Sequence, residues 1–187
     1  MPNWCSNHVV VEGSEEEVLS LLALASSGQD EDGFENVFSF ENLFPTPSDL
    51  LEDDGWYMWR VNSWGTKWDL NQPHVKLEGP EKGGVEGCLV FQLFYETAWS
   101  PPLAFWSHVA KKYSTLKITQ EFFEEGNCFI GQTFLNGEES TVDEYVLTDE
   151  MYFKAGAVFD DEGDIDWDNS AEFDMWKVFP LENHYNY

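Results

Sequence analysis

The chain has 187 residues, of which 42% are hydrophobic and 17% are aromatic. This length suits one domain, or one domain with an appendage, and it supplies enough apolar side chains for a core. A net charge of −27 would suit a disordered chain, but disordered chains are poor in aromatic residues. We therefore expect a folded protein.

The charge is unevenly distributed. Residues 1–54 hold 13 acidic side chains and no Lys or Arg, residues 55–137 hold 8 acidic and 7 basic ones, and residues 138–187 hold 15 acidic and 2 basic ones. Anionic surfaces repel nucleic acids and anionic membranes, and they attract basic proteins over long distances. We expect a basic protein as partner, and no direct contact with nucleic acid or membrane.

The cysteines and the apolar runs indicate in which cellular compartment the protein resides. Cys5, Cys88 and Cys128 are widely spaced and form no C-x-x-C motif, which favours reduced, packed thiols in a cytoplasmic protein. The N-terminus lacks the basic flank and apolar core of a signal peptide. The most apolar run, residues 18–25, is too short to span a bilayer. We expect a cytoplasmic protein.

The first elements along the chain are a strand and a helix. Residues 7–13, NHVVVEG, form a β-branched run closed by glycine, which predicts a strand. Ser14 with Glu17 three positions later forms a capping box and predicts a helix that ends near Gly28.

An insertion is expected at about 35–87. Prolines and glycines break this region, and its predicted elements are short. They are a possible strand at 37–40, an extended segment at 56–61, a strand or loop edge at 75–78, and a turn-rich linker at 79–87.

Residues 88–96, CLVFQLFYE, alternate in polarity and predict a central strand. Ser100 followed by two prolines predicts the start of a second helix. Its apolar positions fall on one helical stripe: Leu103, Trp106, Ala110 and Tyr113.

Residues 116–125 and 128–136 predict a β-hairpin that turns on Gly126 and Asn127. The resulting order up to residue 137 is strand, helix and strand, followed by strand, helix, strand and strand. This pattern is typical of an α+β, ferredoxin-like split β-α-β sandwich, an antiparallel sheet with two helices on one face.

The last segment, 138–187, differs in character from the domain predicted at 1–137. We expect it to be an acidic, β-rich extension packed on that domain, with strands at 151–160 and 173–180.

Three separated motifs carry a family resemblance. MPNWCSNHVVVEG at the N-terminus, NSWGTKWD at 62–69 and FYETAWSPP at 94–102, followed by the hairpin EFFEEGNCFIGQ, resemble the YubB-like family. The resemblance covers residues 1–137. It implies a ferredoxin-like domain and a setting on conjugative plasmids and bacteriophages, and it supplies no established activity.

The tryptophan motifs have two interpretations. In one, they form a contact surface or pocket made of Asn62, Trp64, Lys67, Trp68, Glu96 and Trp99, since tryptophan is typical of binding hot spots. In the other, Trp64 and Trp68 both pack against Trp99 and pin the insertion to the sheet. Gly65 then supplies a bend, and Lys67 forms an ion pair with Asp69.

No motif of an enzyme is present. The histidines His8, His74, His108 and His184 are far apart, and the sequence contains no nucleophile elbow and no phosphate-binding glycine loop. We expect a protein that is not an enzyme and that has no cofactor.

The acidic run near the C-terminus is the second candidate surface. It contains Asp160, Asp161, Glu162, Asp164, Asp166 and Asp168. If residues 164–168 are extended, their three aspartates form a row spaced by about 6.6 Å, which resembles a row of DNA phosphates. The alternative is a solvated edge strand protected by its charges.

The functional hypothesis is a non-enzymatic, acidic interaction protein of a phage or plasmid. It binds a basic host protein, such as a nuclease or another DNA-binding defence protein, as a DNA mimic or counter-defence inhibitor. Two alternatives are a domain that binds a small molecule or nucleotide in a Trp-lined pocket, and an enzyme without a recognised motif.

Overall fold

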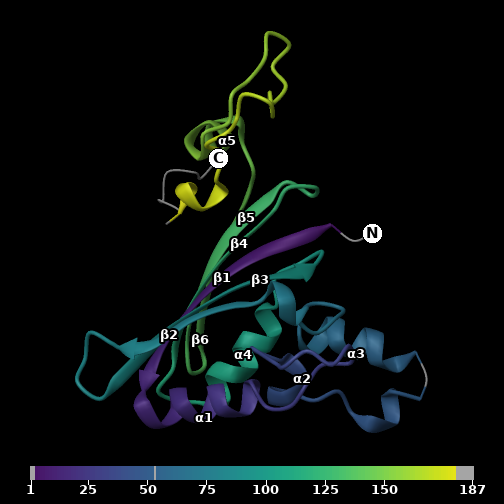
Figure 1. The fold of residues 1–187 in the computed structure, drawn as a ribbon, viewed down its shortest axis with the longest axis vertical. Coiled ribbons are helices and arrows are strands. Elements are labelled where there is room, and N and C mark those ends of the chain that lie inside the picture. The colour runs from purple at the N-terminus through teal and green to yellow at the C-terminus, as the bar shows by residue number, and fades with distance from the viewer. Residues whose placement is uncertain (1–2, 53, 180–187) are drawn as a thin grey trace.

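The protein is described by a computed structural model that covers residues 3–52 and 54–179. It contains one six-stranded antiparallel sheet (Figure 1). The strands are β1 (Trp4–Ser14), β2 (Lys76–Lys82), β3 (Cys88–Ala98), β4 (Lys117–Glu124), β5 (Phe129–Asn136) and β6 (Glu139–Val146). The α-helices are α1 (Glu15–Ala25), α2 (Phe40–Leu43), α3 (Gly55–Ser63), α4 (Leu103–Lys112) and α5 (Asp149–Ala155), and the short 3-10 helices are η1 (Ser48–Leu50), η2 (Gln72–His74) and η3 (Met175–Val178).

The fold is ferredoxin-like, as the pattern of elements predicts. Four strands lie in the order β2-β3-β1-β4, and each neighbouring pair is antiparallel. Helix α1 follows β1 and helix α4 connects β3 to β4, which is the split β-α-β arrangement. Strands β5 and β6 extend the sheet beyond β4, so the sheet continues across residue 137, where the sequence suggests a boundary.

The main core lies between the sheet and helices α1 and α4. It contains the inward-facing residues of β1 and β3, together with aromatic side chains from the helices and from the insertion. Trp106 of α4 donates a hydrogen bond from Nε1 to the hydroxyl of Tyr95 at 2.7 Å. The buried rings of Phe38, Phe40 and Trp64 fix the insertion to this core.

Helix α1 begins where the capping signal predicts. The Ser14 hydroxyl accepts a hydrogen bond from the Glu17 amide. The Glu17 carboxylate accepts hydrogen bonds from the amide and hydroxyl of Thr115, so it ties the start of α1 to the loop after α4.

Two elements predicted in the insertion are wrong. Residues 37–40 form no strand; they lead into α2, which begins at Phe40. Residues 56–61 belong to helix α3, in which Trp59 packs against Phe44 and Trp64 of the insertion. These tertiary contacts override the extended preference of an aromatic-rich segment. The predicted insertion also includes β2, which is a core strand paired with β3.

The segment 147–179 forms a lobe with its own small core on the opposite face of the sheet from α1 and α4. We call it the C-terminal lobe. Both strands predicted here are wrong: residues 151–160 begin within helix α5, and residues 173–179 contain η3, with Pro180 outside the described residues. Helix α5 forms because the Thr148 hydroxyl caps its start and Gly156, at φ 98°, ends it.

Trp176 of η3 connects the lobe to the sheet. Its ring lies edge-on to Phe123 and to His8, with centroid distances of 4.9 and 5.8 Å. His8 Nδ1 lies 2.9 Å from Glu121 Oε2, and its Nε2 lies 2.9 Å from Gln92 Oε1. Burial lowers the pKa of His8, but the hydrogen bonds to Glu121 and Gln92, together with the negative charges of Glu121 and Glu78, raise it more, so the net pKa lies above its ordinary value.

The three thiols are free. Cys5 is buried and Cys88 is half-buried, whereas Cys128 is exposed, so the expectation of a packed thiol is wrong for Cys128. Burial raises the pKa of the Cys5 thiol.

No helix in residues 3–52 and 54–179 is long and apolar enough to cross a membrane.

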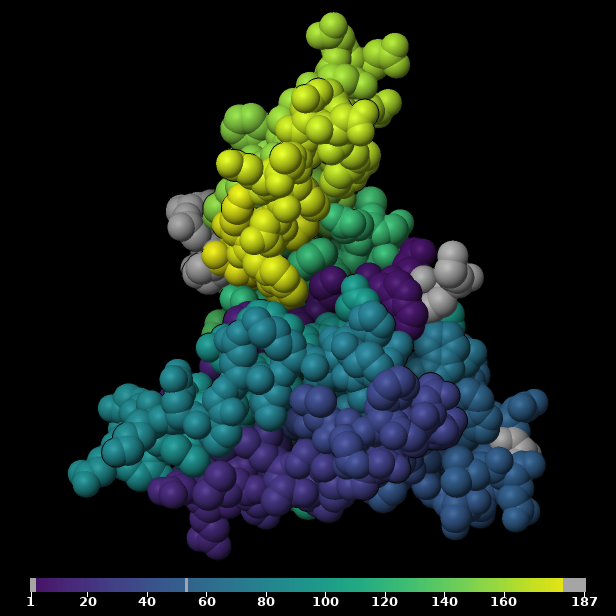
Figure 2. Space-filling model, in the orientation of Figure 1, coloured from purple at the N-terminus to yellow at the C-terminus, as the bar shows by residue number. Residues whose placement is uncertain are grey.

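The acidic segments lie at opposite ends of the molecule. Figure 1 shows the loop of the C-terminal lobe at one end of the long axis, and helices α1, α2 and α3 at the other. In the space-filling view the lobe projects from the rest of the molecule (Figure 2). The carboxylates of the N-terminal region therefore do not extend the acidic run of residues 160–168.

Candidate functional site

Three tryptophans from three parts of the chain meet at the surface. Trp4 begins β1, Trp68 follows α3, and Trp99 lies between β3 and α4. The Trp4 and Trp68 ring centroids are 6.3 Å apart, and those of Trp68 and Trp99 are 5.8 Å apart. Their exposed fractions are 46%, 37% and 39%. We call these three residues the tryptophan surface.

The backbone at Trp99 is strained. Its φ of 67° is in the left-handed region, which bulky residues rarely adopt. The Trp99 amide donates to the carbonyl of Asn3 at 2.9 Å, and the Thr97 hydroxyl donates to the carbonyl of Ser100 at 2.8 Å. Such conformations cost about 1–3 kcal/mol and cluster at functional sites. The hydrogen bonds therefore hold Trp99 at the surface against this strain.

Ser100 stabilises the loop between β3 and α4 and does not cap helix α4. Its hydroxyl donates to the carbonyl of Gly65 at 2.6 Å, and α4 begins at Leu103 after Pro102. The predicted helix cap at Ser100 is therefore wrong. Gly65 has φ 90°, and a Cβ atom there would lie 3.0 Å from the Pro101 carbonyl oxygen. The bend predicted at Gly65 is confirmed, and the close approach of two loops requires it.

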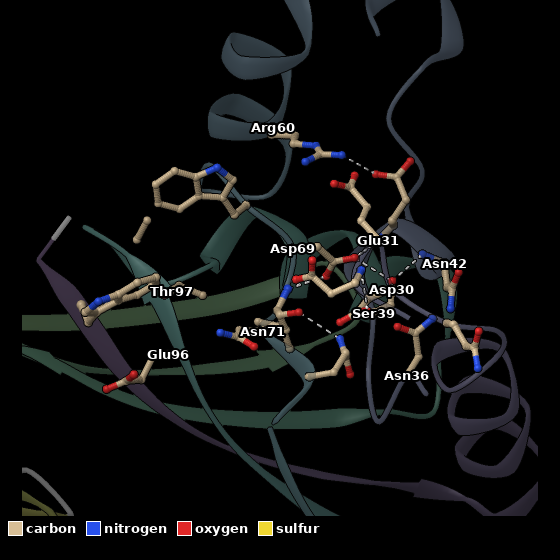
Figure 3. Close-up of a pocket in the computed structure, with 18 residues that line it drawn as sticks. Asp30, Glu31, Asn36, Ser39, Asn42, Arg60, Asp69, Asn71, Glu96 and Thr97 are labelled. Carbon is tan, nitrogen blue, oxygen red and sulfur yellow. Dashed lines mark hydrogen bonds and ion pairs between the residues drawn. The ribbon is translucent and has the colours of Figure 1, made fainter. Parts of the chain in front are cut away.

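A cavity of about 410 Å³ lies beside the tryptophan surface, between the insertion and the ends of β1 and β3. Trp4 and Trp68 form part of its wall. In Figure 3, Asp30 and Glu31 lie on the insertion side, and Glu96 and Thr97 lie on the β3 side. We call this cavity the acidic pocket.

The acidic pocket carries a strong negative charge. Its acidic lining residues are Asp30, Glu31, Asp32, Glu41, Asp69 and Glu96. Among the described lining residues, Arg60 is the one Lys or Arg, and its guanidinium is engaged: Nη2 lies 3.1 Å from Glu41 and Nε donates to Thr46 at 2.9 Å. The remaining carboxylates favour a cationic ligand.

Asp69 anchors the wall of the pocket. Its carboxylate accepts hydrogen bonds from the Ser39 hydroxyl, from the amides of Phe40 and Glu41 at the start of α2, and from the amide of Leu70. Burial raises the pKa of Asp69, and these hydrogen bonds lower it in part. Because four donors occupy its oxygens, the Asp69 carboxylate holds the insertion in shape.

Five of the six predicted contact residues separate into three groups. Trp68, Glu96 and Trp99 lie together at the tryptophan surface and the acidic pocket. Trp64 is fully buried, and its Nε1 donates to the Phe44 carbonyl at 2.9 Å. Asn62 is exposed on α3 and does not line the pocket.

The packing interpretation of the same motif is right only in part. Trp68 packs against Trp99, but Trp64 packs against Phe40 and Trp59. The predicted ion pair between Lys67 and Asp69 is wrong, because the Asp69 carboxylate is half-buried and accepts hydrogen bonds from the start of α2. Lys67 instead lies over aromatic rings.

Sequence reasoning missed Trp4 and the acidic loop at residues 30–32 as parts of the site. Trp4 belongs to the N-terminal motif that carries the family resemblance, and this was the available signal. Asp30, Glu31 and Asp32 have no sequence signal beyond their charge, because only the fold brings them beside Trp68.

The acidic run 160–168 is not an extended row. Phe159 and Ile165 form an isolated bridge, and Asp160 accepts hydrogen bonds from the amides of Glu162 and Asp164, so residues 160–164 form a turn. A second turn contains Asp166, Trp167, Asp168 and Asn169. The regular spacing of carboxylates expected for residues 164–168 is therefore wrong.

Across residues 3–52 and 54–179, no group of three or more His, Cys, Asp or Glu side chains is placed to hold a metal ion.

Comparison with known proteins supports the fold. Residues 88–167 match a protein family described as a ferredoxin-like domain in Api92-like protein. The matched segment begins with β3 and extends through α5 into the loop of the C-terminal lobe. Searches of curated proteins and of solved structures found no match.

Proposed function

We propose that this protein is a non-enzymatic binding protein for a basic partner protein, which docks on the tryptophan surface and the acidic pocket. The observation that carries the proposal is the meeting of three half-exposed tryptophans with a cavity whose lining is acidic. Tryptophan dominates binding energy at protein interfaces because it buries a large area. Carboxylates beside it select basic partners and speed their association.

The setting of the proposal comes from the family resemblance. A protein of a plasmid or phage, acting in the cytoplasm, meets host proteins that bind DNA, and these expose Lys and Arg for phosphate contacts. A nuclease or another DNA-binding defence protein therefore fits as partner, and binding would inhibit it by covering its basic surface. The contact proposed here lies at the acidic pocket, not at the acidic run of residues 160–168.

A second candidate function is binding of a small molecule. The volume of the acidic pocket, about 410 Å³, lies in the range of small-molecule sites. Its carboxylates favour a cationic molecule over a nucleotide, because phosphates would be repelled.

Two variants of equal charge test the proposal. One replaces Asp30, Glu31 and Asp32 by Asn, Gln and Asn, and the other replaces Asp164, Asp166 and Asp168 by Asn. Binding of a fluorescent, lysine-rich ten-residue peptide is measured by anisotropy at about 50 mM and about 300 mM NaCl. We expect the first variant to weaken binding about tenfold and the second less than about threefold, with affinity falling as salt rises.

An equal loss of affinity in the two variants would show that peptide binding depends only on the net charge of the protein, and would contradict a specific site. A larger loss in the second variant would move the contact to the C-terminal lobe. Binding that does not change with salt would contradict recognition of a basic partner.

A further inference from the structure

Lys67 lies among three aromatic rings. Its Nζ atom is 4.5 Å from the ring centroid of Trp68, 5.3 Å from that of Tyr57 and 5.8 Å from that of Trp99. Cations within about 6 Å of a ring centroid are attracted by the ring quadrupole. We call Tyr57, Trp68 and Trp99 the aromatic cage.

Among the Lys and Arg side chains that the structure describes, Lys67 lies near the most aromatic rings: three, against two for Arg60 and one each for Lys76 and Lys112. With 36 acidic residues against 9 basic ones, a lysine has many carboxylates to pair with. Three other cations, Arg60, Lys76 and Lys111, form ion pairs with glutamates. Within residues 3–52 and 54–179, Lys67 forms no ion pair. Its ammonium group lies instead near the three rings of the aromatic cage.

The aromatic cage is open to solvent and adjoins the acidic pocket. Tyr57, on α3, is 37% exposed, as is Trp68. Trp68 belongs both to the cage and to the wall of the acidic pocket. A cation that arrives from outside therefore reaches the rings and the carboxylates together.

We propose that the aromatic cage binds a lysine side chain of the basic partner, and that Lys67 fills the cage until the partner arrives. This inference rests on the proposed function and assigns the residue type that the site accepts. The cage suits an ammonium group, because three ring centroids lie within 6 Å of this compact charge. A planar guanidinium gains most by stacking flat on a ring, and Trp68 and Trp99, tilted by 30° to each other, do not offer it parallel faces.

Because Lys67 occupies the cage, a lysine of the partner has to compete with it for the same rings. The partner's lysine must displace the Lys67 ammonium group, which then becomes solvated at the surface. Removal of Lys67 therefore strengthens binding, whereas removal of a cage ring weakens it. A lysine that merely supports the loop gives the opposite result, because its loss would disturb the site.

The test compares Lys67→Ala with Lys82→Ala. Lys82 is exposed at the end of β2, so its removal changes the net charge equally without touching the cage. The probe is the lysine-rich peptide of ten residues, with an arginine-rich peptide of the same length as comparison. We expect Lys67→Ala to raise affinity for the lysine peptide by roughly threefold to thirtyfold, and Lys82→Ala by less than about twofold.

A double-mutant cycle locates the gain in the cage. The Lys67→Ala change is combined with Trp68→Ala, and separately with Tyr57→Leu, which retains an apolar side chain on α3. We expect each ring substitution to reduce the gain from Lys67→Ala. Thermal unfolding of every variant checks that the fold is retained.

The outcomes separate this inference from the proposed function. If the wild-type protein binds the lysine peptide through the acidic pocket but Lys67→Ala binds no better than Lys82→Ala, the competitive cage is wrong and the proposed function stands. A larger gain for the arginine peptide overturns the assignment to lysine. If neither peptide binds, both proposals are wrong.

Discussion

Two acidic loops at opposite ends of the molecule have the same local structure. The first contains DEDGF at 30–34 and the second DDEGD at 160–164. In the first, the Asp30 carboxylate accepts hydrogen bonds from the amides of Asp32 and Phe34, and the Gly33 amide donates to the Asp30 carbonyl at 3.1 Å. The second loop repeats each of these bonds, with Asp160 as the acceptor and Gly163 as the glycine.

The loops differ in their neighbours. The first lines the acidic pocket, where Trp68 and Glu96 also lie. The second extends from the C-terminal lobe, at the opposite end of the molecule from helices α1, α2 and α3 (Figure 1). An aspartate and a glycine three positions apart are enough to make the turn, but the fold decides whether the carboxylates share a site with aromatic rings. Acidity alone therefore does not identify a binding surface.

The largest expected effect compares two half-buried carboxylates, of which Asp69 holds the start of α2 and Asp166 holds only its own turn. Asp69→Asn places amide hydrogens against the donors at the start of α2 and should lower the free energy of unfolding by about 2–4 kcal/mol. Asp166→Asn, in the C-terminal lobe, should cost less than about 1 kcal/mol, because Asn can still accept from the Asn169 amide. Urea unfolding of both variants measures the difference, and equal losses would refute the anchoring role of Asp69.

Because the two loops have the same local structure, the same glycine-to-alanine substitution should lower the free energy of unfolding equally in both. Gly33 and Gly163 have φ of 85° and 89°, and a Cβ atom at either position meets no atom within 4 Å. Alanine should therefore cost each loop only the strain of the left-handed region, about 1–2 kcal/mol. Unfolding of Gly33→Ala and Gly163→Ala measures both. Losses that differ by more than about 1 kcal/mol would show that the loops are not equivalent.

Trp99→Gly should separate stability from binding. Glycine relieves the strain at φ 67°, which offsets the loss of a partly buried ring, so the free energy of unfolding should change by less than about 1 kcal/mol. Binding of the lysine-rich peptide should fall several-fold. Trp167→Ala, which removes an exposed ring of the C-terminal lobe, should leave binding unchanged. A large loss of stability in Trp99→Gly would make Trp99 a structural residue.

The smallest effect concerns the attachment of the C-terminal lobe. Because the folded pKa of His8 is raised above its ordinary value of 6.5, its protonated form stabilises the fold. This stability is fully present below pH 6.5 and is lost as the pH rises through the folded pKa of His8. Urea unfolding from about pH 5.5 to about pH 8.5 should show the decline in the wild type, and His8→Gln should flatten it. An identical pH dependence in the variant would exclude His8 as its source.

The sequence predicts the framework well because periodicity and caps are local signals. The strand at 88–96, the capped helix after Ser14 and the hairpin at Gly126 are all present. Helix α3 was missed because its aromatic residues favour strands, and contacts of Trp59 with Phe44 stabilise it. Helix α5 was missed although Thr148 and the two acids after it give a start signal.

The candidate site was predictable only in part. Trp64 and Trp68 belong to one motif, yet Trp64 is buried and Trp68 lies at the surface. The bend at Gly65 sends them in different directions, and no pattern in the sequence reveals which ring stays exposed. The acidic loop at 30–32 was visible only as charge. Its role depends on the packing of the insertion against β3, which is a tertiary property.

The most direct test uses the nine tryptophans as reporters. Each indole N–H gives its own signal in a nitrogen–proton NMR spectrum, and the lysine-rich peptide is added in steps. We predict that the signals of Trp4, Trp68 and Trp99 shift first and most, while that of Trp167 stays in place. A largest shift at Trp167, or equal shifts at all nine indoles, would contradict a specific basic-partner site at the tryptophan surface.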